Sequence, residues 1–140
     1  MSHERTILIV DDNVNLVLGF AKLLRNAGYG VYTAYAAADG LRLALLHRPD
    51  AIILDFRMPL INGVGFLYRL RELTDHRHTP VMVVTGVTIS DEQRAEFSDL
   101  HAIVQFKPIS VKDFLIETAR MVSGPHSKAV AEPGVESFVR

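Results

Sequence analysis

The chain has 140 residues, of which 49% are apolar and 22% charged, a size and composition typical of one soluble globular domain. A formal net charge of -1 provides no field that would hold nucleic acid or an anionic membrane, so we expect neither as a partner. The lack of cysteine excludes disulfides, thiolate metal sites and cysteine nucleophiles. The apolar run before the first aspartates is too short for a signal peptide core, and we expect a cytoplasmic protein.

The chain opens with a strand pattern followed by a helix pattern. The β-branched run Thr6–Val10 predicts a strand whose carboxyl end is followed by two carboxylates, Asp11 and Asp12. Apolar residues at helical spacing then predict a helix that begins at Val14 and stops at Gly28. The first strand would therefore deliver an acidic pair to one edge of a sheet.

Two further strands follow in the first half of the chain. Val31–Ala34 predicts a short edge strand, and the alanine-rich helix after it ends before Pro49. The unbroken apolar run Ala51–Leu54 predicts a strand buried on both faces, because strands with one wet face alternate. This strand ends at Asp55, so a third carboxylate emerges at a carboxyl end, the edge at which open α/β sheets bind ligands.

The second half of the chain continues the alternation. The polar stretch Thr74–His78 follows a third amphipathic helix, and we expect it to be a solvated loop and not a metal site. Val81–Val84 predicts a buried strand that runs into Thr85. The capping-box spacing of Ser90 and Gln93 predicts the start of a fourth helix. The apolar face of that helix is thin, so it should be the least firmly packed helix.

A fifth strand and a last helix complete the pattern. Ala102–Phe106 predicts the strand, and Lys107 and Pro108 follow it directly. The apolar residues that carry the helical spacing are Val17, Leu18, Ala21 and Leu24 in the first helix, Leu41, Ala44 and Leu45 in the second, Phe66, Leu67, Leu70 and Leu73 in the third, and Val111, Phe114, Leu115 and Val122 in the last.

Five strand–helix repeats predict a parallel sheet with helices on both faces, joined by right-handed crossovers. At this length the simplest closure is a flavodoxin-like (βα)5 three-layer sandwich with strand order 2-1-3-4-5. The first and third strands flank the switch point in that order. Asp11, Asp12 and Asp55 would then meet in one crevice, with Thr85 and Lys107 arriving from the next two strands.

This set of side chains is suited to a divalent cation and a phosphoryl group. Three carboxylates in one crevice repel one another unless a cation is bound, and ligation by oxygen alone favours Mg²⁺. The ammonium of Lys107 could neutralise a phosphoryl oxygen, and Thr85 could donate a hydrogen bond to another. A carboxylate such as Asp55 can itself accept the phosphoryl group as an acyl phosphate.

The residues that carry this chemistry also carry a resemblance to a family. Asp11-Asp12, Leu54-Asp55-Phe56-Arg57-Met58-Pro59, Asn62-Gly63, Thr85 and Lys107-Pro108 resemble the signature of response-regulator receiver domains of two-component signalling, the CheY-like superfamily. The resemblance covers about residues 5 to 123, in matching order and spacing. We therefore expect residues 1–123 to form a receiver domain and residues 124–140, which lack sustained periodicity, to form a flexible tail or linker.

The resemblance implies roles for these residues. Asp55 would be phosphorylated by a histidine kinase or a histidine phosphotransfer protein. Mg²⁺ would be held by Asp12, Asp55, the backbone carbonyl of Arg57 and Asp11, the last partly through water. Thr85 and Lys107 would contact the phosphoryl group and relay its presence to the face of helix four, strand five and helix five. The Lys107-Pro108 peptide bond would be cis, as it often is in this family. By analogy with the family, two copies of the chain could dimerise through helices four and five.

Two positions depart from the pattern of the family. Receivers usually carry tyrosine or phenylalanine three residues before the lysine, whereas this chain has Val104. Phe106 would lie on the same face of the strand as Val104, so it could compensate. Arg57 would lean over one side of the phosphoryl site, where we expect it to tune the lifetime of the phosphorylated state.

Two other functions remain open from the sequence. A Mg²⁺-dependent phosphatase of the haloacid-dehalogenase type also forms an aspartyl phosphate at a strand end, but it needs a second aspartate two residues later, where this chain has Arg57. An inactive receiver-like interaction module is favoured by Val104 and opposed by the complete set of acidic, hydroxyl and lysine residues. The leading expectation is a switch whose chemistry is limited to its own phosphorylation and dephosphorylation, and so not an enzyme.

Overall fold

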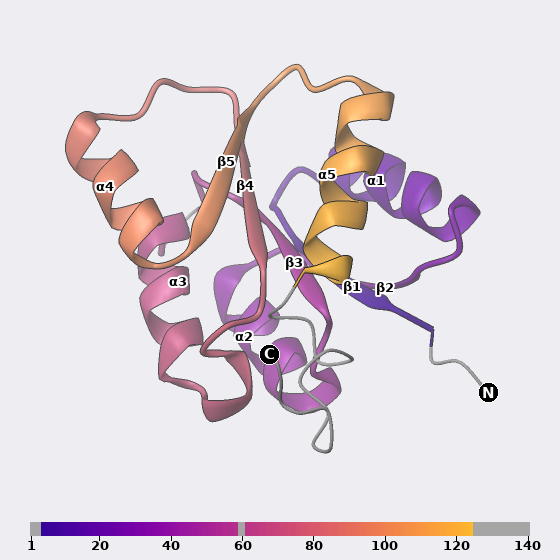
Figure 1. The fold of residues 1–140 in the computed structure, drawn as a ribbon, viewed down its shortest axis with the longest axis horizontal. Coiled ribbons are helices and arrows are strands. Elements are labelled where there is room, and N and C mark those ends of the chain that lie inside the picture. The colour runs from indigo at the N-terminus through magenta and orange to yellow at the C-terminus, as the bar shows by residue number, and fades with distance from the viewer. Residues whose placement is uncertain (1–3, 59–60, 125–140) are drawn as a thin grey trace.

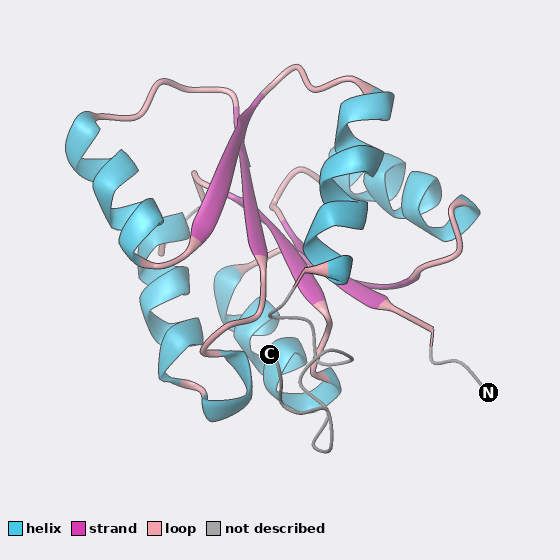
Figure 2. Cartoon of the chain, viewed as in Figure 1, coloured by secondary structure: helices cyan, strands magenta, loops and turns pink. Residues whose placement is uncertain are grey.

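The structure is a computed structural model that describes residues 4–58 and 61–124, and in these ranges one parallel sheet lies between two layers of helices (Figure 1). Figure 2 shows how strands and helices alternate along the chain. The strands are β1 (Thr6–Val10), β2 (Gly30–Ala34), β3 (Ala51–Asp55), β4 (Val81–Thr85) and β5 (Ala102–Phe106). The helices are α1 (Val14–Asn26), α2 (Ala37–His47), α3 (Gly63–Glu72), α4 (Asp91–Asp99) and α5 (Val111–Ser123), with a short 3-10 helix, η1 (Thr74–His76).

The sheet order is β2-β1-β3-β4-β5, which confirms the predicted flavodoxin-like topology. All neighbouring strands pair in parallel, with Val10 opposite Leu54 and Asp55 opposite Val84. Because β1 and β3 are neighbours, the residues that follow their carboxyl ends lie at the same edge of the sheet. The topology thus brings together two segments that are more than forty residues apart in the sequence.

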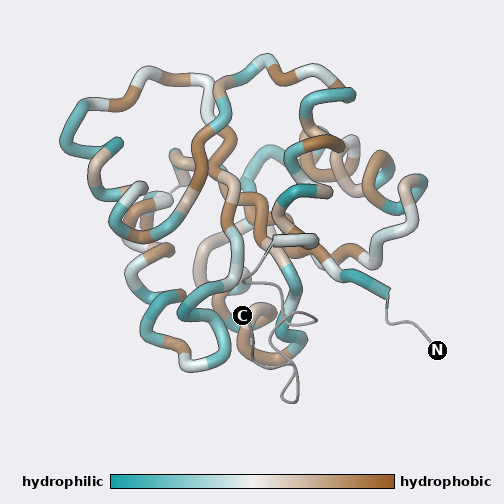
Figure 3. Tube along the Cα trace, viewed as in Figure 1, coloured by the Kyte–Doolittle hydropathy of each residue, from teal (hydrophilic) through white to brown (hydrophobic). Residues whose placement is uncertain are grey.

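Each face of the sheet carries its own hydrophobic core. On one face α1 and α5 bury Val17, Phe20, Ala21, Leu24, Phe114, Met121 and Val122. On the other face α2, α3 and α4 bury Ala37, Ala44, Phe66, Leu67, Leu70 and Phe97. Figure 3 shows hydrophobic residues concentrated along the central strands. Every residue of β3 and β4 is buried, as expected for strands covered on both faces.

Three apolar residues that the helical spacing marked point away from these cores. Leu18, Leu45 and Val111 are 54%, 61% and 53% exposed. In α1 the buried positions are spaced by three, one and three residues from Val17, so Leu18 falls one position outside the buried stripe. Ala44 takes the core position of α2 next to Leu45. The prediction located these helices correctly, but it assigned to their buried faces these three residues, which are exposed.

The prediction of a solvated loop at Thr74–His78 was wrong for His76. The segment forms η1, and the His76 side chain is fully buried. Its Nε2 donates to the carbonyl oxygen of Ala44 at 2.7 Å, and its Nδ1 pairs with the hydroxyl of Thr79 at 2.7 Å. Both ring nitrogens therefore have hydrogen-bond partners, as buried polar groups in folded proteins almost always do. The residue is a structural link between α2 and the entry to β4.

The last helix ends at Ser123, and Gly124 follows as its cap. The rest of the predicted tail, residues 125–140, lies outside the described residues. Among the helices in the described ranges, none is long and apolar enough to cross a membrane.

Candidate functional site

Three carboxylates lie together at the carboxyl ends of β1 and β3. Asp55 is the last residue of β3, and Asp11 and Asp12 directly follow β1. One oxygen from each carboxylate lies within 4.8 Å of the others. Asp55 and Asp11 are only 8% and 4% exposed, whereas Asp12 is exposed to solvent. The sequence prediction that the sheet order would gather these residues agrees with this geometry.

The cluster is separate from the cap of the first helix. Asn13 caps α1, since its side-chain oxygen accepts a hydrogen bond from the backbone nitrogen of Leu16 at 3.1 Å. The Asp11 carboxylate accepts from the backbone nitrogen of Asn13 at 2.9 Å, and the Asp11 nitrogen donates to Ala34 on β2 at 3.1 Å. These bonds fix Asp11 at the edge of the sheet, and helix capping does not explain the acidic pair.

Lys107 bridges two of the carboxylates from the end of β5. Its Nζ lies 3.7 Å from an oxygen of Asp11 and 3.6 Å from an oxygen of Asp55. The Lys107 backbone nitrogen donates to the carbonyl oxygen of Thr85 at 2.7 Å, and the Lys107-Pro108 peptide bond is cis. One ammonium facing three carboxylates leaves two negative charges uncompensated when all three are ionised. A divalent cation would match that excess.

Burial and mutual repulsion disfavour the charged form of this cluster. Burial, followed by the charge of Asp11, raises the pKa of Asp55 to about 6, although the ammonium of Lys107 opposes the shift. Burial likewise raises the pKa of Asp11, against the hydrogen bond from Asn13 and the charge of Lys107. A strongly shifted carboxylate with defined charge partners is a mark of functional sites. Binding of a cation would therefore stabilise the ionised carboxylates of the cluster.

Thr85 ends β4 beside the cluster and is buried, with 1% exposure. Its hydroxyl accepts a hydrogen bond from the backbone nitrogen of Val87 at 3.2 Å, which ties it to the loop that leads to α4. Its register partner on β5 is Phe106. Thr85 thus ends the strand that lies between β3, which carries Asp55, and β5.

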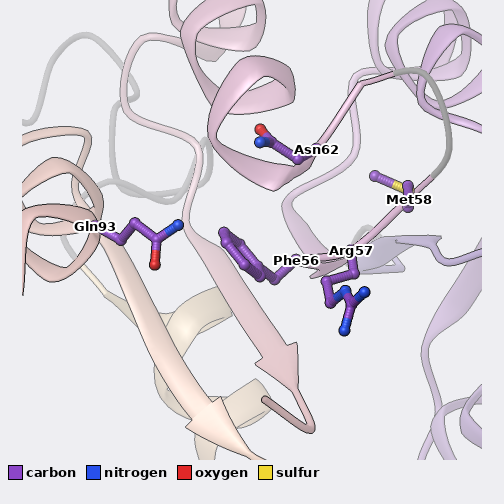
Figure 4. A pocket seen from close by; sticks show the side chains of 5 residues that line it. All are labelled: Phe56, Arg57, Met58, Asn62 and Gln93. Carbon is purple, nitrogen blue, oxygen red and sulfur yellow. The ribbon is translucent and has the colours of Figure 1, made fainter. Parts of the chain in front are cut away.

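Arg57 follows Asp55 by two residues and lines a cleft of about 540 Å³. The cleft is lined by Phe56, Arg57, Met58, Asn62 and Gln93, and Figure 4 shows Gln93 extending from α4 toward Phe56. Arg57 is exposed to solvent. The cleft gives a molecule from solution access to the β3–α3 connection beside Asp55.

Gly63 positions the site in a way that the sequence pattern did not reveal. Its nitrogen donates to the carbonyl oxygen of Phe56 at 2.8 Å. A Cβ at this position would lie 3.1 Å from the Phe56 Cα and 3.3 Å from the Asp55 carbonyl oxygen. A Cβ at position 63 would force these backbone atoms apart, so glycine lets α3 start close to the backbone of β3. The Asn62-Gly63 pair was a motif in the sequence, but its steric reason appears only in three dimensions.

The chain resembles receiver proteins in both sequence and fold. The family described as "Response regulator receiver domain" matches residues 7–117. This chain belongs to the response-regulator receiver family. Over 122 residues the chain is 34% identical to the polar-differentiation response regulator DivK of Brucella anthropi. The matched stretch covers 86% of this chain and 97% of that protein.

Solved structures agree with this membership. The fold is similar to that of the chemotaxis protein CheY4 of Vibrio cholerae, with a TM-score of 0.79 and 29% identity over 85% of this chain and 99% of that chain. It is also similar to the signal receiver domain of a histidine kinase from Syntrophus aciditrophicus, with a TM-score of 0.77 and 26% identity over 86% of this chain and 91% of that chain. As a receiver, the chain is a signalling module more than an enzyme, and the family implies a histidine kinase partner.

Proposed function

We propose that this receiver is a phosphorylation-activated switch in which Asp55 accepts a phosphoryl group from a histidine kinase or a histidine phosphotransfer protein in the cytoplasm. The observation that carries the proposal is the cluster of Asp11, Asp12 and Asp55, whose charge Lys107 only partly balances. The cluster lies at the carboxyl edge of the sheet, beside a cleft open to solution. We assign the activity to the receiver domain of residues 1–123.

The donor set fits Mg²⁺. Carboxylate oxygens are hard ligands, and Mg²⁺ binds one or two of them while keeping sites for water and phosphate oxygens. The pKa values of Asp55 and Asp11 are raised mainly by burial, so a cation would favour their ionised forms. Asp12, Asp55 and the backbone carbonyl of Arg57 would hold the ion, with Asp11 acting partly through water. When bound, Mg²⁺ supplies charge neutralisation for the phosphoryl oxygens.

The chain's own residues position and neutralise the phosphoryl group. A carboxylate oxygen of Asp55 attacks phosphorus, the bond from phosphorus to the donor's imidazole nitrogen breaks, and the imidazole leaves with its electron pair and takes up a proton. The Lys107 ammonium lies close enough to Asp55 to form an ion pair with an oxygen of the phosphoryl group bound there. The Thr85 hydroxyl donates a hydrogen bond to another oxygen. Transfer of this kind relies on placement and electrostatics more than on covalent assistance.

Hydrolysis of the acyl phosphate limits the lifetime of the signal. Water attacks phosphorus and loses a proton to solvent, and the bond between phosphorus and the Asp55 oxygen breaks. The Asp55 carboxylate keeps the electron pair, and inorganic phosphate is released. We expect Arg57, which is exposed and lines the cleft, to hinder the approach of that water. The protein acts only on its own phosphoryl group, so it turns over no external substrate.

The signal would leave through the face formed by α4, β5 and α5. Thr85 and Lys107 connect this face to Asp55, because they end β4 and follow β5. Phosphorylation would change the face and so control a downstream protein, or dimerisation of two copies of this chain through α4 and α5.

Intact-protein mass spectrometry after incubation with acetyl phosphate and Mg²⁺ tests the proposal. We expect a mass increase of one phosphoryl group that EDTA prevents and that Asp55→Asn lacks, while Asp39→Asn on α2 gains mass like the parent. Multiple-turnover hydrolysis of unrelated phosphate esters would instead support a phosphatase. A parent protein without any adduct would support an inert interaction module.

A further inference from the structure

Helix α4 is loosely attached to the core of the molecule. Phe97 is the one buried residue among the described residues of α4, whereas each of the other four α-helices buries three or four. The Phe97 ring packs edge-on against Phe56, the residue after Asp55, with centroids 5.7 Å apart. This agrees with the predicted thin apolar face. A helix with so little buried surface can change its position at low cost.

The carboxyl end of α4 is nevertheless held firmly by Arg71 of α3. The guanidinium donates to the carbonyl oxygens of Leu100 at 2.9 Å and His101 at 3.4 Å, which follow the last turn of α4. It also donates to the carbonyl oxygens of His76 at 2.9 Å and Thr79 at 2.7 Å. Arg71 thus fastens the end of α4 to η1 and the entry to β4, so this end is a fixed point.

The amino-terminal half of α4 has a different and more exposed attachment. The Arg94 guanidinium carbon lies 5.5 Å from the centroid of the Phe106 ring on β5. Phe106 is 39% exposed, and among the described residues no carboxylate forms an ion pair with Arg94. At exposed sites such a cation–π contact contributes about 0.5–1 kcal/mol. It is strong enough to bias the position of the helix and weak enough to break.

This contact is connected to the proposed phosphoryl site through Thr85. Thr85 and Phe106 are register partners on adjacent strands, so their side chains lie on the same face of the sheet. The hydroxyl of Thr85 also holds the nitrogen of Val87, in the short loop that leads to the cap of α4 at Ser90. A rotation that carries the hydroxyl toward a phosphoryl group on Asp55 would release this loop and change the space beside Phe106.

We propose that the Arg94–Phe106 contact is a latch between α4 and β5 that opens when Asp55 is phosphorylated, while Arg71 keeps the carboxyl end of α4 in place. The latch rests on the proposed function, because phosphorylation is what opens it. Val104, at the position where receivers usually carry the aromatic residue that responds to phosphorylation, is a valine partly buried against the core. Phe106, one residue before Lys107, takes that role at the surface.

A single tryptophan tests the latch, because the chain has none of its own. Phe106→Trp keeps an aromatic ring under Arg94, and tryptophan is the best partner for such a contact. Ile103→Trp is a matched control, since it lies on the same strand, is similarly exposed at 41% and faces the other side of the sheet. Each variant is measured with acetyl phosphate and Mg²⁺, and the phosphorylated fraction is determined by intact mass in the same samples.

We expect phosphorylation to shift the emission maximum of Phe106→Trp to the value that Arg94→Gln/Phe106→Trp shows without phosphodonor. The double variant should gain phosphoryl mass without a further shift, and Ile103→Trp should gain mass without a shift. Mass gain without a shift in Phe106→Trp, or with an equal shift in the double variant or in Ile103→Trp, would overturn the latch but leave the proposed function intact. Absence of mass gain in all variants would overturn both.

Discussion

Replacing Asp55 by asparagine should stabilise the metal-free protein at neutral pH, although it removes the proposed acceptor. The pKa of Asp55 is raised from 3.8 to about 6 by burial and by Asp11. Each pKa unit corresponds to about 1.4 kcal/mol, so ionised Asp55 costs the folded state about 2 to 3 kcal/mol after allowance for screening at the open side of the site. Asparagine keeps the shape of the side chain and avoids this cost.

The pH dependence follows from the direction of the shift. The folded protein binds the Asp55 proton more tightly than the unfolded chain does, so the contribution of Asp55 to the stability of the folded state is most favourable below pH 4. It falls as the pH rises from about 4 to about 6 and is level above that range. Asp55→Asn should show a shallower decline, because the contribution of Asp55 is removed while burial still raises the pKa of Asp11.

Urea denaturation in EDTA at several pH values between 4 and 8 measures this effect. Asp39→Asn is the control, because the Asp39 side chain is 61% exposed and its ion pair among the described residues is with the exposed Arg42. We expect that control to be neutral or slightly destabilising. An Asp55→Asn protein that is no more stable than the parent above pH 6, or that declines as steeply with pH, would refute the electrostatic description of the site.

Three further substitutions test individual contacts, and a fourth, Gly19→Ala, is a control for one of them. Lys107→Met should raise the pKa of Asp55 above about 6, because the ammonium now lowers it, and an unchanged value in an NMR titration of the carboxyl carbon would contradict this. Gly63→Ala should lower the free energy of unfolding by about 1–3 kcal/mol, because its Cβ would lie 3.3 Å from the Asp55 carbonyl oxygen. Gly19→Ala, where a Cβ meets nothing within 4 Å, should instead stabilise by about 0.5–1 kcal/mol in the same urea titrations. Arg57→Ala should speed dephosphorylation on the order of 10-fold, which is about 1.4 kcal/mol, and an equal decay rate of phosphorylated protein would argue against shielding by Arg57.

The fold was predictable because the strongest signals in the sequence are long and local. The unbroken apolar runs at β3 and β4 indicate strands covered on both faces, and their alternation with helices leaves few ways to close the sheet. The gathering of Asp11, Asp12 and Asp55 followed from topology alone, because parallel strands end at a common edge. No side-chain geometry was needed for that step.

Features that depend on distant partners were not predictable in the same way. His76 is buried because it finds the carbonyl oxygen of Ala44, thirty-two residues earlier, and no local pattern announces that bond. The sequence placed Phe106 on the same face as Val104, but its partner Arg94 comes from a helix whose position periodicity does not specify. Such contacts are set by packing between elements, and packing leaves little trace in the spacing of residues.

Reductive trapping tests the central claim most directly. Borohydride reduces an aspartyl phosphate to homoserine, so protein treated with acetyl phosphate and Mg²⁺ can be reduced, digested and sequenced by mass spectrometry. We predict homoserine at position 55 and unmodified aspartate at Asp11 and Asp12, with no homoserine when EDTA replaces Mg²⁺. Homoserine at Asp11 or Asp12, or its absence from position 55 in a protein that has gained phosphoryl mass, would contradict the assignment of Asp55 as the acceptor.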